Sequence, residues 1–132
     1  MKIKIAFLLS LTILFTGVSV IKAQHPLKEA DNAFKYCQYE KALDEYKTGI
    51  RKIRKNQIEV RRVTYQIAEC YRIMGDIKNA EKFYERLEKK NYQKDNPMIL
   101  FHLGNIALSK GEYADALKYF ENFKKRAPED KR

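Results

Sequence analysis

The chain has 132 residues, 45% of them hydrophobic, and a formal net charge of +10. This length fits a single domain. A basic excess can indicate nucleic acid or an anionic surface as a partner, but acidic and basic residues alternate here, which favours an ordinary solvated surface and no nucleic acid.

The first 23 residues have the composition of a secretory signal peptide. Lys2 and Lys4 give a basic start, residues 5–21 are mostly apolar, and Ala23 offers a small residue at a cleavage point. The alternative is a retained signal anchor, although the run is slightly shorter than the roughly 20 residues needed to span a bilayer. We predict a signal peptide over residues 1–23, a folded domain over 24–132, and export to the periplasm or cell envelope.

Three segments of the remaining chain place small and aromatic residues at matching positions. An alanine followed by an aromatic residue four places later occurs at Ala42, Ala80 and Ala116, which are 38 and then 36 residues apart. Another small residue precedes each alanine by 12 positions, and these residues are Ala30, Ala68 and Gly104. Such a recurring period predicts a repeat architecture.

Each repeat is predicted to form two helices joined by a tight turn. In chain order, the expected helices cover residues 27–36, 39–54, 62–74, 77–90, 99–109 and 113–126. Gly75 and Gly111 suit left-handed turns, and Cys37 takes their place in the first repeat. Longer connections are expected near 55–57 and 92–96, and no strand pattern is present.

The small residues suggest where paired helices approach each other closely. Gly104 and Ala116 would lie at such a crossing, where a bulky side chain would cost about 1–3 kcal/mol. The expected filling around this crossing comes from Leu100, Leu103, Tyr113, Phe120 and Phe123. A single hairpin cannot bury its apolar face, so successive hairpins should stack.

These positions resemble the tetratricopeptide repeat (TPR). The third repeat carries nearly all of the residues that this family favours, with Ala107 as the clear departure: Leu100, Leu103, Gly104, Gly111, Tyr113, Ala116, Phe120 and Pro128. The resemblance implies an all-α, right-handed superhelix of three hairpins, with repeats at about 23–56, 61–94 and 97–130. It also implies a scaffold for protein–protein interaction.

A narrower resemblance concerns the first repeat. Residues 30–34 and 39–46 are similar to the amino-terminal TPR region of OmpA-like envelope proteins, some of which belong to type IX secretion. Those proteins continue into a β-propeller and a peptidoglycan-binding domain, which these 132 residues do not contain. The chain is expected to be either a truncated relative or a separate repeat protein.

The family resemblance also implies a concave groove lined by the first helix of each repeat. The residues expected to contact a protein or peptide there are Phe34, Tyr65, Gln66, Glu69, Arg72, Phe101, His102 and Asn105. Their mixture of aromatic, amide and charged groups suits an extended peptide or a partner helix. Asn105 can both donate to and accept from a peptide backbone.

No catalytic constellation is predicted, so we expect no enzyme activity, cofactor or metal site. His25 and His102 lack metal-ligand spacing, and Cys37 and Cys70 are expected to be free thiols. Leu117 and Phe123 on the last helix are expected to lack cover, which predicts self-association or docking there. Alternative functions are a membrane-tethered adaptor with a retained leader, a basic module for anionic envelope polymers, and a small enzyme.

Overall fold

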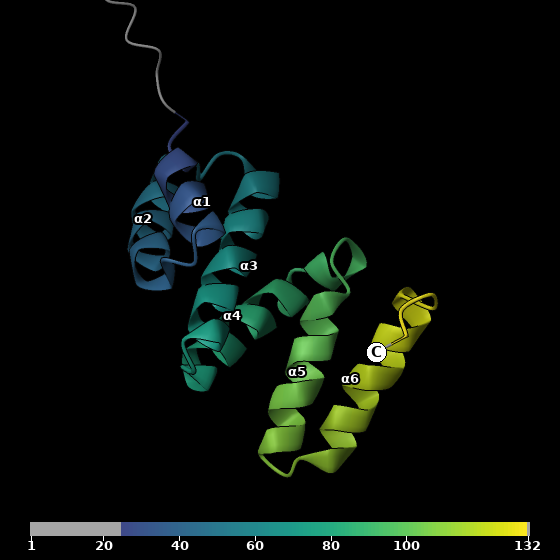
Figure 1. The fold of residues 1–132 in the computed structure, drawn as a ribbon. Coiled ribbons are helices and arrows are strands. Elements are labelled where there is room, and N and C mark those ends of the chain that lie inside the picture. The colour runs from purple at the N-terminus through teal and green to yellow at the C-terminus, as the bar shows by residue number, and fades with distance from the viewer. Residues whose placement is uncertain (1–24, 132) are drawn as a thin grey trace, which may run out of the picture.

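The computed structural model describes residues 25–131, so the predicted signal peptide lies outside the described residues. All regular structure in this part of the chain is helical (Figure 1). The elements are α1 (Lys28–Lys35), α2 (Tyr39–Lys52), α3 (Gln57–Ile73), α4 (Ile77–Lys89), the short 3-10 helix η1 (Tyr92–Lys94), α5 (Met98–Ser109) and α6 (Tyr113–Arg126). The predicted all-α class is confirmed.

The helices pair in sequence and the pairs stack. Helices α1 and α2, α3 and α4, and α5 and α6 form three hairpins that follow one another through the molecule (Figure 1). The second helix of each hairpin packs against the first helix of the next, as α2 does on α3 and α4 on α5. The stacking buries apolar faces that a single hairpin would leave in water.

Small residues lie where the helices meet, as the repeat pattern predicted. The alanines and glycine that define the repeats are all buried: Ala30, Ala42, Ala68, Ala80, Gly104 and Ala116. A methyl group added to Gly104 would lie 2.6 Å from Cε1 of Phe120, closer than carbon atoms approach in folded proteins. Glycine at this position therefore lets the Phe120 ring of α6 pack directly on the backbone of α5.

The turns within the three hairpins use the left-handed backbone region, as does Asn91 before η1. Gly75 and Gly111 have φ angles of 82° and 76°, and Cys37 has a φ of 58° at the equivalent place in the first hairpin. Residues other than glycine, asparagine and aspartate rarely adopt this backbone conformation, so Cys37 carries backbone strain. Its thiol is exposed and that of Cys70 is buried, and both are free, as predicted.

Helix α3 begins five residues before the predicted start. The Asn56 side chain accepts a hydrogen bond from the backbone N–H of Glu59 at 3.2 Å and caps the helix, so residues 57–61 are helical. The connection expected near 55–57 is present as residues 53–56, and Gln57 alone of the expected residues is in α3. The expected connection near residues 92–96 is present and contains η1.

Two predictions about the third hairpin were wrong. Tyr113 is 71% exposed and does not fill the crossing, because it begins α6 at the solvent edge. Phe123 is only 4% exposed, since its ring packs against Phe101 at 5.4 Å, and it does not lack cover. Leu117 is 61% exposed, as expected for an uncovered residue of this helix.

Within residues 25–131, no helix combines the length and the apolar character that crossing a membrane requires.

Candidate functional site

A depression of about 370 Å³ lies between the second and third hairpins. Four of the predicted partner-binding residues line it, and they are Arg72 from α3 with Phe101, His102 and Asn105 from α5. Ile77, Ile106 and Ser109 complete the lining. The repeat stacking thus brings part of the predicted groove together, with apolar side chains beside a guanidinium and an amide.

A buried polar cluster forms one side of this depression. The carboxylate of Glu69 accepts hydrogen bonds from the Arg72 guanidinium, at 2.7 Å, and from the Tyr84 hydroxyl. Nε2 of His102 lies 3.2 Å from the same carboxylate, and the His102 ring stacks on the Tyr84 ring at 5.2 Å. The cluster joins α3, α4 and α5.

The hydrogen bonds decide the charge state of Glu69. Burial raises the pKa of this carboxyl, but the hydrogen bonds from Arg72 and Tyr84, with the positive charge of Arg72, outweigh burial and lower the pKa below its usual value. Burial and the neighbouring carboxylate raise the pKa of the Tyr84 hydroxyl. Glu69 is therefore ionised and Tyr84 protonated at neutral pH.

Glu69 and His102 are less open than the groove prediction implies, although His102 still lines the depression. Both residues are buried, with exposures of 9% and 8%, and their polar atoms face each other. When hairpins stack tightly, the groove positions of one repeat lie close to the next repeat. Glu69 and His102 then pair with each other, which lowers the cost of removing them from water. Glu69 thus holds the Arg72 guanidinium, and its contact with His102 joins α3 to α5.

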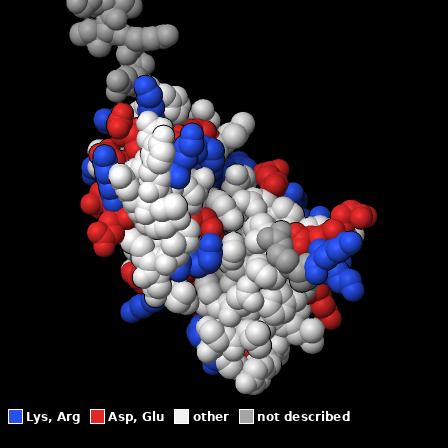
Figure 2. Space-filling view, in the orientation of Figure 1, with Lys and Arg blue, Asp and Glu red and all other residues white. Residues whose placement is uncertain are grey.

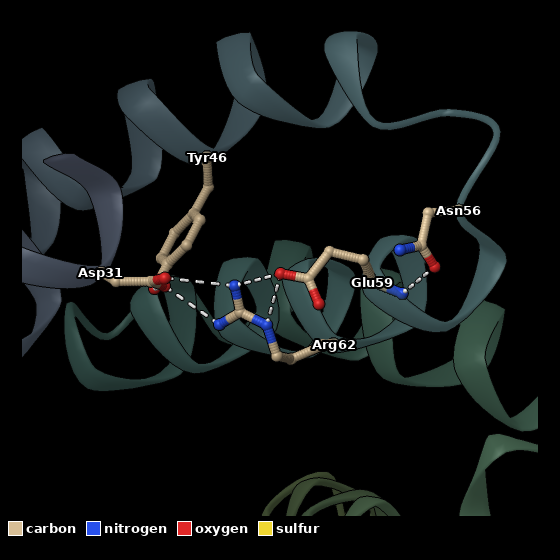
Figure 3. Close-up of polar contacts among 5 residues, drawn as sticks. All are labelled: Asp31, Tyr46, Asn56, Glu59 and Arg62. Carbon is tan, nitrogen blue, oxygen red and sulfur yellow. Dashed lines mark hydrogen bonds and ion pairs between the residues drawn. The ribbon is translucent and has the colours of Figure 1, made fainter. Parts of the chain in front are cut away.

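The first two hairpins are joined by a second polar cluster (Figure 3). Asp31 of α1 accepts a hydrogen bond from the Tyr46 hydroxyl of α2 at 2.7 Å and pairs with the Arg62 guanidinium of α3 at 3.0 Å. Arg62 also binds Glu59 at 2.6 Å, one turn earlier on the same helix. Both Asp31 oxygens receive a guanidinium N–H, which fixes the relative position of the two hairpins.

The other predicted groove residues lie apart from the depression. Phe34 is half-buried and packs on Tyr39 at 5.5 Å, within the first hairpin. Tyr65 packs on Tyr84 at 6.1 Å, and burial raises the pKa of its hydroxyl to about 12. Gln66 is half-buried on α3. A binding role for these three residues remains a prediction.

Sequence reasoning missed Ile77 and Ile106 in the depression. Ile77 is the first residue of α4, so a search restricted to the first helix of each repeat could not find it. Ile77 is apolar, yet it is 39% exposed. An isoleucine directly after the Gly-Asp turn was the sequence feature that could have indicated an exposed apolar residue here. Ile106 is on α5 and is only 4% exposed, so most of its surface belongs to the core.

A second pocket, of about 450 Å³, lies at the carboxyl-terminal end of the array. Its described lining comes from α5, α6 and the segment after α6, and consists of Phe101, Asn105, Phe120, Phe123, Lys124, Pro128, Asp130 and Lys131. Only Phe101 and Asn105 among them belong to the predicted groove. In Figure 2 the lower part of the molecule is largely uncharged, whereas acidic and basic side chains intermingle over the first two hairpins and gather again at the right-hand edge.

Neither pocket has the composition of a metal centre. In residues 25–131, no group of three or more histidine, cysteine, aspartate and glutamate side chains is arranged to hold a metal ion.

The chain consists of helix hairpins that repeat the same positions and stack with small residues at their contacts. This arrangement defines the class of α-helical repeat proteins. Comparison with known families assigns the repeat: residues 62–89 and 99–130 each match a profile of the tetratricopeptide repeat. The chain is a tetratricopeptide repeat protein. No curated protein matches it. Repeats of this family are generally non-catalytic scaffolds that bind other proteins or peptides.

Proposed function

We propose that the chain is an exported scaffold that holds another protein in the cell envelope, through the depression between α3 and α5. The observation that carries the proposal is the lining of this depression. Phe101, Ile77 and Ile106 offer apolar contact, while Arg72 and Asn105 offer hydrogen-bond donors at its edge.

The buried cluster around Glu69 supports this role by reducing the cost of binding. Glu69 holds the Arg72 guanidinium through two N–H groups, at 3.2 and 2.7 Å, so Arg72 loses little freedom when a partner arrives. A fixed guanidinium beside apolar side chains suits a peptide segment that carries an acidic or carbonyl group next to an apolar anchor.

The envelope location is proposed from the sequence of the leader. A connection to secretion or to OmpA-like assemblies is proposed from the resemblance of the first repeat to the amino-terminal TPR region of OmpA-like envelope proteins. Intact mass of the protein recovered from the envelope fraction tests export. A mass that corresponds to cleavage after Ala23 supports a free scaffold, whereas retention of residues 1–23 in a membrane fraction would favour the tethered adaptor.

A pull-down from envelope extract tests the depression. The variant Arg72→Gln/Ile77→Ala changes two of its side chains while leaving a hydrogen-bond donor beside Glu69. The matched control is Arg54→Gln/Ile58→Ala, because both residues are exposed and lie away from the depression. We expect the first variant to lose a partner that the wild type and the control retain. Equal recovery by all three proteins would refute this site.

A further inference from the structure

The first two hairpins share an acid–tyrosine pair, defined as a carboxylate on the first helix and a tyrosine 15 residues later on the second. Tyr46 donates to Asp31 in the first hairpin, and Tyr84 donates to Glu69 in the second. Each carboxylate also faces a basic or histidine side chain on the first helix of the following hairpin. Arg62 of α3 takes this place for Asp31, and His102 of α5 for Glu69.

The third hairpin has the same two positions but different chemistry. Counting the same spacing gives Asn105 on α5 and Phe120 on α6. An amide is neutral and a phenylalanine ring has no hydroxyl, so these two positions offer no carboxylate to a cation. Asn105 is exposed and Phe120 half-buried, whereas Tyr46 and Tyr84 are 1% and 0% exposed.

The pocket of about 450 Å³ lies at these positions. In the first two hairpins the corresponding surface is covered by a helix, α3 over the first and α5 over the second. Tyr84 is 0% exposed beneath α5, whereas its counterpart Phe120 is half-buried; Leu87 and its counterpart Phe123 are both buried, at 1% and 4%. Internal equivalence therefore indicates that the surface shape at the end of the third hairpin is one that receives a helix.

The charges around this pocket favour an acidic occupant. Lys124 and Lys131 line it against a single described carboxylate, that of Asp130. Lys125 and Arg126 follow Lys124 in the last turn of α6, and Glu121 and Glu129 lie on either side of this turn. Residues 121–131 therefore carry four basic and three acidic side chains, a small positive excess. Acidic side chains on an incoming helix would meet these cations, which speeds association and sets orientation.

We propose that this pocket binds an amphipathic, acidic α-helix of another protein, which covers the third hairpin as α3 and α5 cover the first two. An apolar side chain of that helix contacts Phe120, and its flanking carboxylates face Lys124 and Lys131. The inference rests on the proposed scaffold function, and it names the chemistry of a partner at a neighbouring surface that shares Phe101 and Asn105 with the depression.

A second copy of this chain is a poorer occupant. The exposed residues of α1 at the other end of the array are polar, namely Lys28, Glu29, Asn32 and Lys35. They would not supply an apolar stripe to the pocket. Two copies joined through the pocket itself would bring the basic last turns of their α6 helices together, which is unfavourable.

Two synthetic helical peptides serve as probes for the 132-residue chain. They share one leucine and phenylalanine stripe and differ only in glutamate or lysine flanks. We expect the wild type to bind the glutamate peptide about tenfold more tightly at low ionic strength. Lys124→Glu/Lys131→Glu should weaken this binding roughly three- to tenfold, while the matched control Lys82→Glu/Lys89→Glu on α4 should not.

Restoring the acid–tyrosine pair gives a second test, at a position that also lines the depression. Asn105→Asp/Phe120→Tyr should shift the preference towards the lysine peptide, because it recreates the carboxylate that meets Arg62 or His102 elsewhere. Circular dichroism checks that each variant is folded.

Other outcomes would overturn the proposal. Equal affinity for both peptides would do so. The proposal also fails if Arg72→Gln/Ile77→Ala abolishes peptide binding while Lys124→Glu/Lys131→Glu leaves it intact. That result would assign peptide binding to the depression, and the proposed scaffold function would stand. Dimerisation of the wild type that competes with the peptide would make a second copy the occupant.

Discussion

The Glu69 carboxylate lies among groups from three helices, with Arg72 on its own helix, Tyr84 on α4 and His102 on α5. A buried carboxylate without such partners would be strongly destabilising, because its desolvation would go uncompensated. The same residue stands at a position where related repeats contact ligands. Its role here is to hold the second and third hairpins together and to orient Arg72.

Glu69 should make the stability of the protein sensitive to acid. Its pKa in the folded state is lower than the usual value of 4.5, so its contribution is present above that pH and is lost as the pH falls through the folded pKa. Glu69→Gln should lower the free energy of unfolding near neutral pH by about 1–3 kcal/mol. It should also reduce the further loss of stability that the wild type shows as the pH falls below 4.5.

Urea denaturation at several pH values measures both effects. Glu40→Gln is the control, since Glu40 is exposed on α2. An acid-induced loss of stability in Glu69→Gln as large as in the wild type would contradict the assignment.

At the scale of the elements, each hairpin depends on its turn. The turns after α3 and α5 use glycine at positive φ, with no atom within 4 Å of the place that a side chain would occupy. The turn after α1 has the same backbone conformation with Cys37. A left-handed conformation costs a residue with a β-carbon about 1–2 kcal/mol, so this turn is the most strained of the three.

Cys37→Gly should therefore stabilise the protein by about 0.5–1 kcal/mol, the relief of strain being partly offset by the greater freedom of glycine in the unfolded chain. The reciprocal change Gly75→Ala should destabilise it by about 1 kcal/mol, through the backbone alone. Urea midpoints under reducing conditions measure both. A Cys37→Gly variant less stable than the wild type would show that the thiol makes a contact that outweighs the strain.

At the scale of the whole molecule, each hairpin packs mainly against the hairpin next to it in the chain. Arg62 joins the first hairpin to the second, and the Glu69 cluster joins the second to the third. In such an array, stability is the sum of each repeat and its interfaces, so damage at one interface should stay local.

Arg62→Met should loosen the first interface selectively. The side chains of Arg62 and Asp31 are 34% and 41% exposed, so solvent screening limits the expected loss to about 1 kcal/mol. Hydrogen exchange should become faster in α1 and α2 and stay unchanged in α5 and α6. Arg61→Met is the control, because the neighbouring Arg61 reaches only the exposed Asp95, at 4.0 Å. A uniform increase in exchange would mean that the array unfolds as one unit.

Much of the fold was predictable because it depends on local, periodic features. Small residues 12 positions apart, aromatics four residues after each alanine, and glycines at turns specify helix hairpins without knowledge of distant contacts. The start of α3 was missed because its signal is a single capping residue, Asn56, which makes one local hydrogen bond. The repeat pattern, which involves many residues, is easier to detect in the sequence.

By itself, then, the sequence determined the helical class, the three-hairpin register and the close approach at Gly104, because each follows from spacing along one chain. Only the tertiary structure decided which groove residues are open. Glu69 and His102 look available in sequence, yet they face each other across a hairpin interface, while Asn105 at the equivalent position of the third hairpin remains exposed. Exposure depends on what packs against a helix face, and residues distant in the sequence supply that packing.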